Sequence, residues 1–81
     1  MSENQARAAH ETAVSRFLSR QSGWRAEYMV RFDEGLYADI LIAGSRERAQ
    51  EICAMWIGQE DCEAFLAMIE PLDMSFGSVL A

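Results

Sequence analysis

The sequence predicts a small α+β domain in which one β-hairpin packs with helices. A chain of 81 residues is long enough for one modest hydrophobic core but not for two. A central segment alternates apolar and polar residues with a period of two, and the segments on both sides carry apolar residues at spacings of three and four. We therefore expect a single domain over residues 1–81, with the element order α-β-β-α-β.

The first expected helix covers residues 3–21. Ser2 and Gln5 have the spacing of a capping box, in which the two side chains satisfy free N–H groups at the helix start. Gly23 follows as a stop signal. The apolar stripe of this helix consists of Ala6, Ala9, Ala13, Val14, Phe17 and Leu18. Because the early stripe is all alanine, the helix can approach another element closely, and we expect Phe17 and Leu18 to anchor it.

Residues 24–32 and 36–43 are expected to form the hairpin, joined by a turn at Asp33-Glu34-Gly35. Period two places the more apolar residues of each strand on one face, namely Trp24, Ala26, Tyr28, Val30 and Phe32 in the first and Leu36, Ala38, Ile40 and Ile42 in the second. This apolar face should receive the next helix.

The opposite face of the hairpin carries Arg25, Glu27 and Arg31 from the first strand and Asp39 from the second. Cross-strand ion pairs are the ordinary explanation for such a set. If one helix layer covers only the apolar face, then Met29, Tyr37 and Leu41 are exposed together and favour a protein contact. If the first helix covers the opposite face, this patch disappears.

The second helix is expected over residues 45–57, with Ser45 as its N-cap and Gly58 as its terminator. Its buried stripe should be Ala49, Ile52, Cys53, Trp56 and Ile57. Residues 59–73 allow two readings, a helix or an extended strand. We favour a third strand over 63–72, because three strands are more stable than an isolated hairpin and Pro71 suits an edge strand.

Charge is the most unusual global property of the chain. The chain has thirteen Asp and Glu residues but only seven basic residues, and the formal net charge is −6. This charge repels nucleic acid and anionic lipid, so we expect no direct binding to either. It serves solubility or attraction to a basic protein surface. The longest apolar runs are far too short to cross a bilayer, and residues 1–9 do not resemble a secretory signal, so we expect a cytoplasmic protein.

No motif for nucleotide binding or zinc-protease chemistry occurs, and the carboxylates lack the spacing of a calcium loop. We therefore expect no enzyme activity, no cofactor and no dedicated metal site. Cys53 and Cys62 do not form a Cys-x-x-Cys pair, and a disulfide between them is not expected. His10, at the apolar edge of the first helix, is expected to be a partly buried, hydrogen-bonded side chain.

The hairpin and the helix after it carry a resemblance. The segments are Tyr28-Met-Val-Arg-Phe, Leu36-Tyr-Ala-Asp-Ile-Leu-Ile-Ala, Gly-Ser and the helix that contains Ala49 and Trp56. In type, over about 35 residues, they resemble the small acidic proteins with which phages and mobile elements block host defences, including anti-CRISPR proteins. The resemblance implies a stoichiometric inhibitor whose carboxylates occupy a basic groove that normally holds nucleic acid.

On that hypothesis, the partner-binding candidates are Asp33, Glu34, Glu60, Asp61 and Glu63. Each of them also has an ordinary explanation in turn or capping chemistry. The alternative function, from a different class, is a small accessory or structural subunit that forms a homodimer through the sheet or through the tail at residues 74–80.

Overall fold

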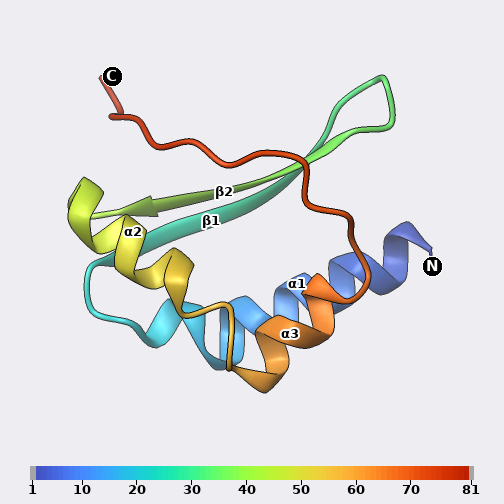
Figure 1. Cartoon of the computed structure of the whole chain (residues 1–81), viewed down its shortest axis with the longest axis horizontal. Coiled ribbons are helices and arrows are strands. Elements are labelled where there is room, and N and C mark those ends of the chain that lie inside the picture. Colours follow the sequence, from blue (N-terminus) through green and yellow to red (C-terminus); the bar gives the residue numbers. More distant parts are fainter. Residues whose placement is uncertain (1, 81) are drawn as a thin grey trace.

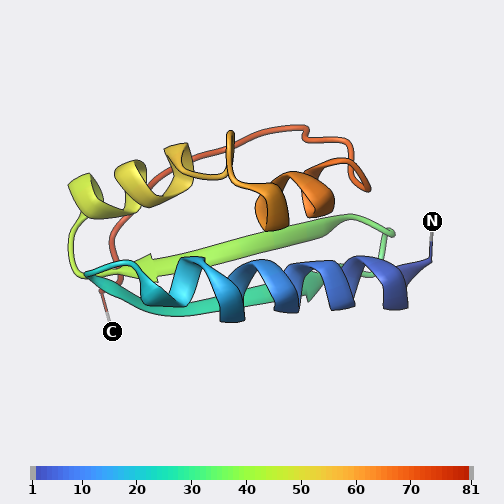
Figure 2. The same cartoon turned by 90° about the horizontal axis from the view of Figure 1, so that it is seen from below.

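The computed structural model describes residues 2–80, which form two layers, a two-stranded antiparallel sheet and a set of helices on one of its faces (Figures 1 and 2). The elements in chain order are α1 (Glu3–Arg16), the 3-10 helix η1 (Leu18–Arg20), β1 (Trp24–Arg31), β2 (Tyr37–Ala43), α2 (Arg46–Ala54) and α3 (Glu60–Leu66). The molecule is 33 × 29 × 18 Å, and the view down its shortest axis shows the sheet above the helices (Figure 1).

Helix α1 begins as predicted and ends earlier. Ser2 and Gln5 form the capping box in both directions. The expected end at residue 21 was wrong, because Phe17 leaves the helical conformation with φ −132° and ψ −62° and the chain tightens into η1. The side chain of Gln21 donates to the Phe17 carbonyl at 3.1 Å and supports this turn. The change of direction leaves Leu18 completely buried.

The hairpin is confirmed to within a residue at its ends. Gly35 in the connecting turn has φ 83°, a conformation that glycine adopts without strain. The strands pair with Tyr28 opposite Ile40, and the register shifts between Trp24 and Ala26. This irregularity places Trp24 on the helix side, where it packs against the core.

The third strand at 63–72 was wrong, and so was the order that depended on it. Residues 60–66 form α3, so the order is α-β-β-α-α. The Gln59 side chain accepts hydrogen bonds from the backbone N–H groups of Asp61 and Cys62, and acidic residues fill the first turn, which favours a helix. Cys62 and Phe65 are then buried one turn apart. Helix α2 is likewise shorter than expected, and Ser45 is confirmed as its cap.

The helices cover the face of the sheet that the sequence predicted to be outside. Met29 and Leu41 pack against the core, whereas Tyr28 and Ile40, on the other face, are 54% and 43% exposed. The contacts between the helices and this face of the sheet give the physical reason. The register shift places the Trp24 indole on this face. In addition, side chains of α1 bind the strand residues Asp39 and Arg31.

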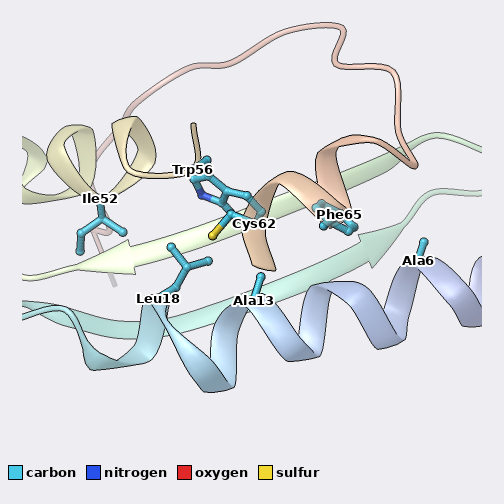
Figure 3. Close-up of a cluster of buried hydrophobic side chains, with 7 residues drawn as sticks. All are labelled: Ala6, Ala13, Leu18, Ile52, Trp56, Cys62 and Phe65. Carbon is cyan, nitrogen blue, oxygen red and sulfur yellow. The ribbon is translucent and has the colours of Figure 1, made fainter. Parts of the chain in front are cut away.

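The core lies between the helices and the covered face of the sheet (Figure 3). Its buried apolar residues are Ala6, Ala13, Leu18, Ile52, Trp56, Cys62 and Phe65. The ring centroids of Trp56 and Phe65 lie 5.7 Å apart, and the two rings are tilted relative to each other. They fill the space between the end of α2 and α3. Most of this core therefore comes from the helices, and the sheet contributes half-buried side chains from one face.

After α3, residues 70–80 run without regular secondary structure. This tail passes to the other side of the sheet and returns toward the end of β2, alongside the sheet rather than across its middle (Figures 1 and 2). All of its residues are exposed. Residues 1 and 81 of the expected domain lie outside the described part. Within that part, no helix has the length and apolar character needed to cross a membrane.

Candidate functional site

A polar cluster lies between α1 and the sheet, where α1 runs along β1 (Figure 2). It consists of His10 from α1, Glu27 from β1 and Asp39 from β2, with one ligand-type atom from each side chain within 4.8 Å of the others. His10 is only 7% exposed, and its Nε2 lies 2.6 Å from Asp39 Oδ1. Glu27 is half-buried and Asp39 is exposed, so the group runs from the core to the surface. We call these three residues the buried cluster after its innermost member, His10.

Neighbouring aromatic groups hold two members of the buried cluster. Trp24 Nε1 donates to Glu27 Oε1 at 3.0 Å, and the Phe65 ring meets the His10 ring edge-on with centroids 5.3 Å apart. The other oxygen of Glu27, Oε2, is buried and has no hydrogen-bond partner. A buried carboxylate oxygen without a partner is costly, so this atom requires a proton or a cation.

Burial, together with the neighbouring Asp39 carboxylate, raises the pKa of Glu27 to about 8, and the Trp24 hydrogen bond opposes this rise. Burial and the neighbouring negative charge therefore both favour the protonated form of the Glu27 carboxyl.

The cysteines lie next to this cluster and are both free thiols. Cys62 is completely buried, and burial, followed by the charge of Glu27, raises its pKa to about 11. Burial also raises the pKa of the half-buried Cys53 thiol. Neither thiol is in the thiolate form that nucleophilic attack requires near neutral pH.

The second notable feature is the open face of the sheet. Alternation and register assign it Ala26, Tyr28 and Val30 from β1 opposite Ile42, Ile40 and Ala38 from β2. None of these six residues is charged. Figure 1 shows the sheet edge-on with the helices of the described chain below it, on the opposite face. We call these six residues the open sheet face. At the hairpin end it continues into Phe32 and Leu36, which are also exposed.

The five predicted partner-binding residues do not form one surface. Asp33 and Glu34 are exposed in the hairpin turn, which extends beyond the body of the molecule (Figure 1). The other three lie in α3, in the helix layer. The structure therefore gives two separate acidic groups.

Local roles explain part of the α3 group. Glu63 Oε2 accepts from the Gly58 N–H at 2.7 Å and closes the turn before the helix. Asp61 is half-buried and lines a shallow groove of about 340 Å³ between α1 and α3. Glu60 is exposed in the first helical turn. Of the three, Glu60 is the residue whose side chain is free for a partner in this arrangement.

The sequence did not reveal the buried cluster, because Glu27 and Asp39 were assigned to an outer face with Arg25 and Arg31. Arg31 instead pairs with Glu3 of α1 at 2.9 Å. One signal was present: His10 lies between Ala6 and Ala13 on the buried stripe of α1, so the predicted burial of this histidine was confirmed. A buried imidazole needs a partner, and only the sheet could supply it.

Comparison with known proteins gives no relative from which a function could be transferred: no family model, no curated protein and no solved structure matches the chain.

Proposed function

We propose that the protein acts by binding another protein molecule rather than by catalysis, and that a second copy of the chain covers the open sheet face. The observation that carries this proposal is the composition of that face. Six uncharged, mainly apolar residues lie together on a chain whose net charge is −6. Exposed apolar patches of this kind are typical of protein contacts.

The chemistry of the face favours a second copy over a basic partner. A basic groove would find no carboxylate among the six residues of the face, so its charges would lose water without gaining ion pairs. A second copy presents the same uncharged strip, and a two-fold axis would bring the two strips together. Stacked sheets pack about 10 Å apart, with side chains interdigitated.

The stability of the sheet also favours a second copy of the chain on this face. An isolated two-stranded hairpin is marginal, and here helices cover one of its faces only. Tyr28 and Ile40 are directly opposite each other and about half exposed, so a second sheet would bury the remaining area of both side chains. Each large apolar side chain contributes about 1.5–3 kcal/mol when it goes from exposed to buried.

Sedimentation velocity over a range of protein concentrations tests this proposal. We expect a dimer whose dissociation constant changes little between low salt and about 0.5 M salt, because apolar burial is not screened. Ile40→Lys places a charge in the centre of the face and should give monomers. Ile57→Lys is the matched control, because Ile57 is 79% exposed but lies after α2 in the helix layer. A wild-type monomer at all concentrations, or dimers of Ile40→Lys, would contradict the proposal.

A second candidate is the inhibitor that the resemblance implies, and the exposed acidic turn supports it. Asp33 and Glu34 lie at the end of a protruding hairpin, where a basic groove could bind them without contact with the rest of the chain. A pull-down from host lysate at low salt should then recover a basic nucleic-acid-binding protein, and about 0.5 M salt should release it. Asp33→Asn with Glu34→Gln should abolish recovery, and full recovery by that variant would exclude this candidate.

A further inference from the structure

The buried cluster has the composition and spacing of a metal-binding site. Three different elements contribute one imidazole and two carboxylates, and the ligand-type atoms lie within 4.8 Å of one another. Ligands of a four-coordinate zinc ion lie about 2.0–2.2 Å from the metal and hence about 3.3 Å from each other. The separations in the cluster, from 2.6 Å between His10 Nε2 and Asp39 Oδ1 to at most 4.8 Å, lie on either side of this value.

The charge around the cluster also calls for a cation. Among residues 2–80, the ion pairs formed by arginines link Arg31 to Glu3 and Arg48 to Glu51, and neither reaches Glu27 or Asp39. In the described part of the chain, the basic side chain that pairs with Asp39 is His10. Independently of this charge, Glu27 Oε2 is buried without a hydrogen-bond partner, so one ligand atom is free to coordinate.

We propose that His10, Glu27 and Asp39 bind a divalent transition-metal ion of the zinc type. An imidazole nitrogen with two carboxylate oxygens suits Zn²⁺ and its neighbours in the first transition series, whereas Mg²⁺ and Ca²⁺ prefer oxygen ligands alone. On binding, the metal replaces the contact between His10 Nε2 and Asp39 Oδ1 with one metal–ligand bond to each of the two atoms.

The surroundings provide access and support. A surface groove of about 320 Å³ between α1 and β1 is lined by His10 and Glu27, so an ion and a water ligand can reach the cluster from solvent. The Trp24 hydrogen bond orients the Glu27 carboxylate, and Phe65 limits rotation of the His10 ring. Groups that orient ligands in this way strengthen metal binding.

Titration of the metal-stripped full-length chain with Zn²⁺, followed by calorimetry, tests this proposal. We expect one Zn²⁺ per chain with release of protons. Glu27→Gln and Asp39→Asn each remove one ligand while keeping the side-chain shape, and each should weaken binding by at least about tenfold. Glu60→Gln makes the same charge change on exposed α3 surface and should leave the affinity unchanged.

Co²⁺ provides a second readout that separates the cluster from the thiols. Bound at the cluster, Co²⁺ should give visible absorption bands of an N/O site without a thiolate charge-transfer band, whereas coordination by Cys53 or Cys62 would produce that band. The expected bands should be absent in Asp39→Asn. No Zn²⁺ binding by the wild-type chain at about 1 mM, a thiolate band, or equal affinity in the wild type and both ligand variants would overturn the proposal.

Discussion

Two glutamates of this protein show how strongly position controls the chemistry of one residue type. Glu3 is on the surface, and its hydrogen bonds from Arg31 and Tyr37 lower its pKa. Glu27 is under the helix layer, where burial and a neighbouring carboxylate raise its pKa to about 8. The Glu3 carboxylate is therefore a charged surface contact, whereas Glu27 keeps its proton to a higher pH than an exposed glutamate does.

Glu27 should make the stability of the metal-free protein depend on pH. Its pKa is about 8 when folded and 4.5 in its ordinary state, so the folded chain holds one more proton between these values. The contribution of this group is fully present below pH 4.5 and is lost as the pH rises toward about 8. The free energy of unfolding should fall by at most about 1.4 kcal/mol per pH unit in this window, and by less because the side chain is partly solvated.

Urea denaturation of the wild type and Glu27→Gln in the presence of a chelator, at several pH values, checks this. The titratable groups around Glu27 are His10 on α1, Asp39 on β2, Cys53 on α2 and Cys62 on α3. Because the variant keeps all of them and removes only the carboxyl proton, the difference between the two curves isolates Glu27. A difference that is constant from pH 4.5 to pH 8 would refute the assignment.

Among the helices and strands, α3 shows how a local capping interaction decides between helix and strand. Residues 63–72 contain apolar residues that fit either structure. The amide oxygen of Gln59 lies 2.8 Å from the Asp61 N–H and 3.4 Å from the Cys62 N–H, so the first free donors of α3 are satisfied. A helix then turns Cys62 and Phe65 together toward α1 and the core, whereas an extended chain would point neighbouring residues to opposite sides.

Removal of this cap should destabilise the protein. Gln59→Ala leaves the two N–H groups without their side-chain acceptor, and we expect a loss of about 1 kcal/mol in the free energy of unfolding. Gln50→Ala is the control, because Gln50 is exposed in α2 and makes no capping bond, so it should change stability by less than about 0.5 kcal/mol. Chemical denaturation measures both. Equal losses would show that the cap contributes nothing specific.

At the scale of the whole molecule, the C-terminal tail should be sensitive to proteases whether or not a partner is bound. Residues 70–80 are exposed and lack secondary structure, whereas Phe65 in α3 is only 4% exposed. Proteases need an extended, accessible segment. The tail should therefore be cut before the body of the domain.

Limited chymotrypsin digestion followed by mass spectrometry tests this expectation. The first cuts should fall after Leu72, Met74 or Phe76, which are exposed in the tail. Phe17 and Phe65 provide the internal control, since both pack in or against the core and should resist until the domain unfolds. Early cleavage after Phe65 would mean that α3 is not held against α1.

The open sheet face is also a property of the whole molecule. The alternation in each strand identified which residues share a face, and that grouping is confirmed for Tyr28, Val30, Ile40 and Ile42. It did not identify which face the helices would cover. Of the two alternatives for Met29, Tyr37 and Leu41, the structure shows the one in which helices cover their face, because Met29 and Leu41 pack against the core.

The sequence by itself determined the α+β class, the hairpin with its glycine turn and the caps at Ser2 and Ser45, because these depend on contacts within a few residues along the chain. The tertiary structure alone decided that the helices pack on the more polar face. It also decided that His10 meets Glu27 and Asp39. The physical reason is that both outcomes depend on how whole helices and strands pack against one another. Local periodicity does not show which polar groups will meet and be buried between the helices and the sheet.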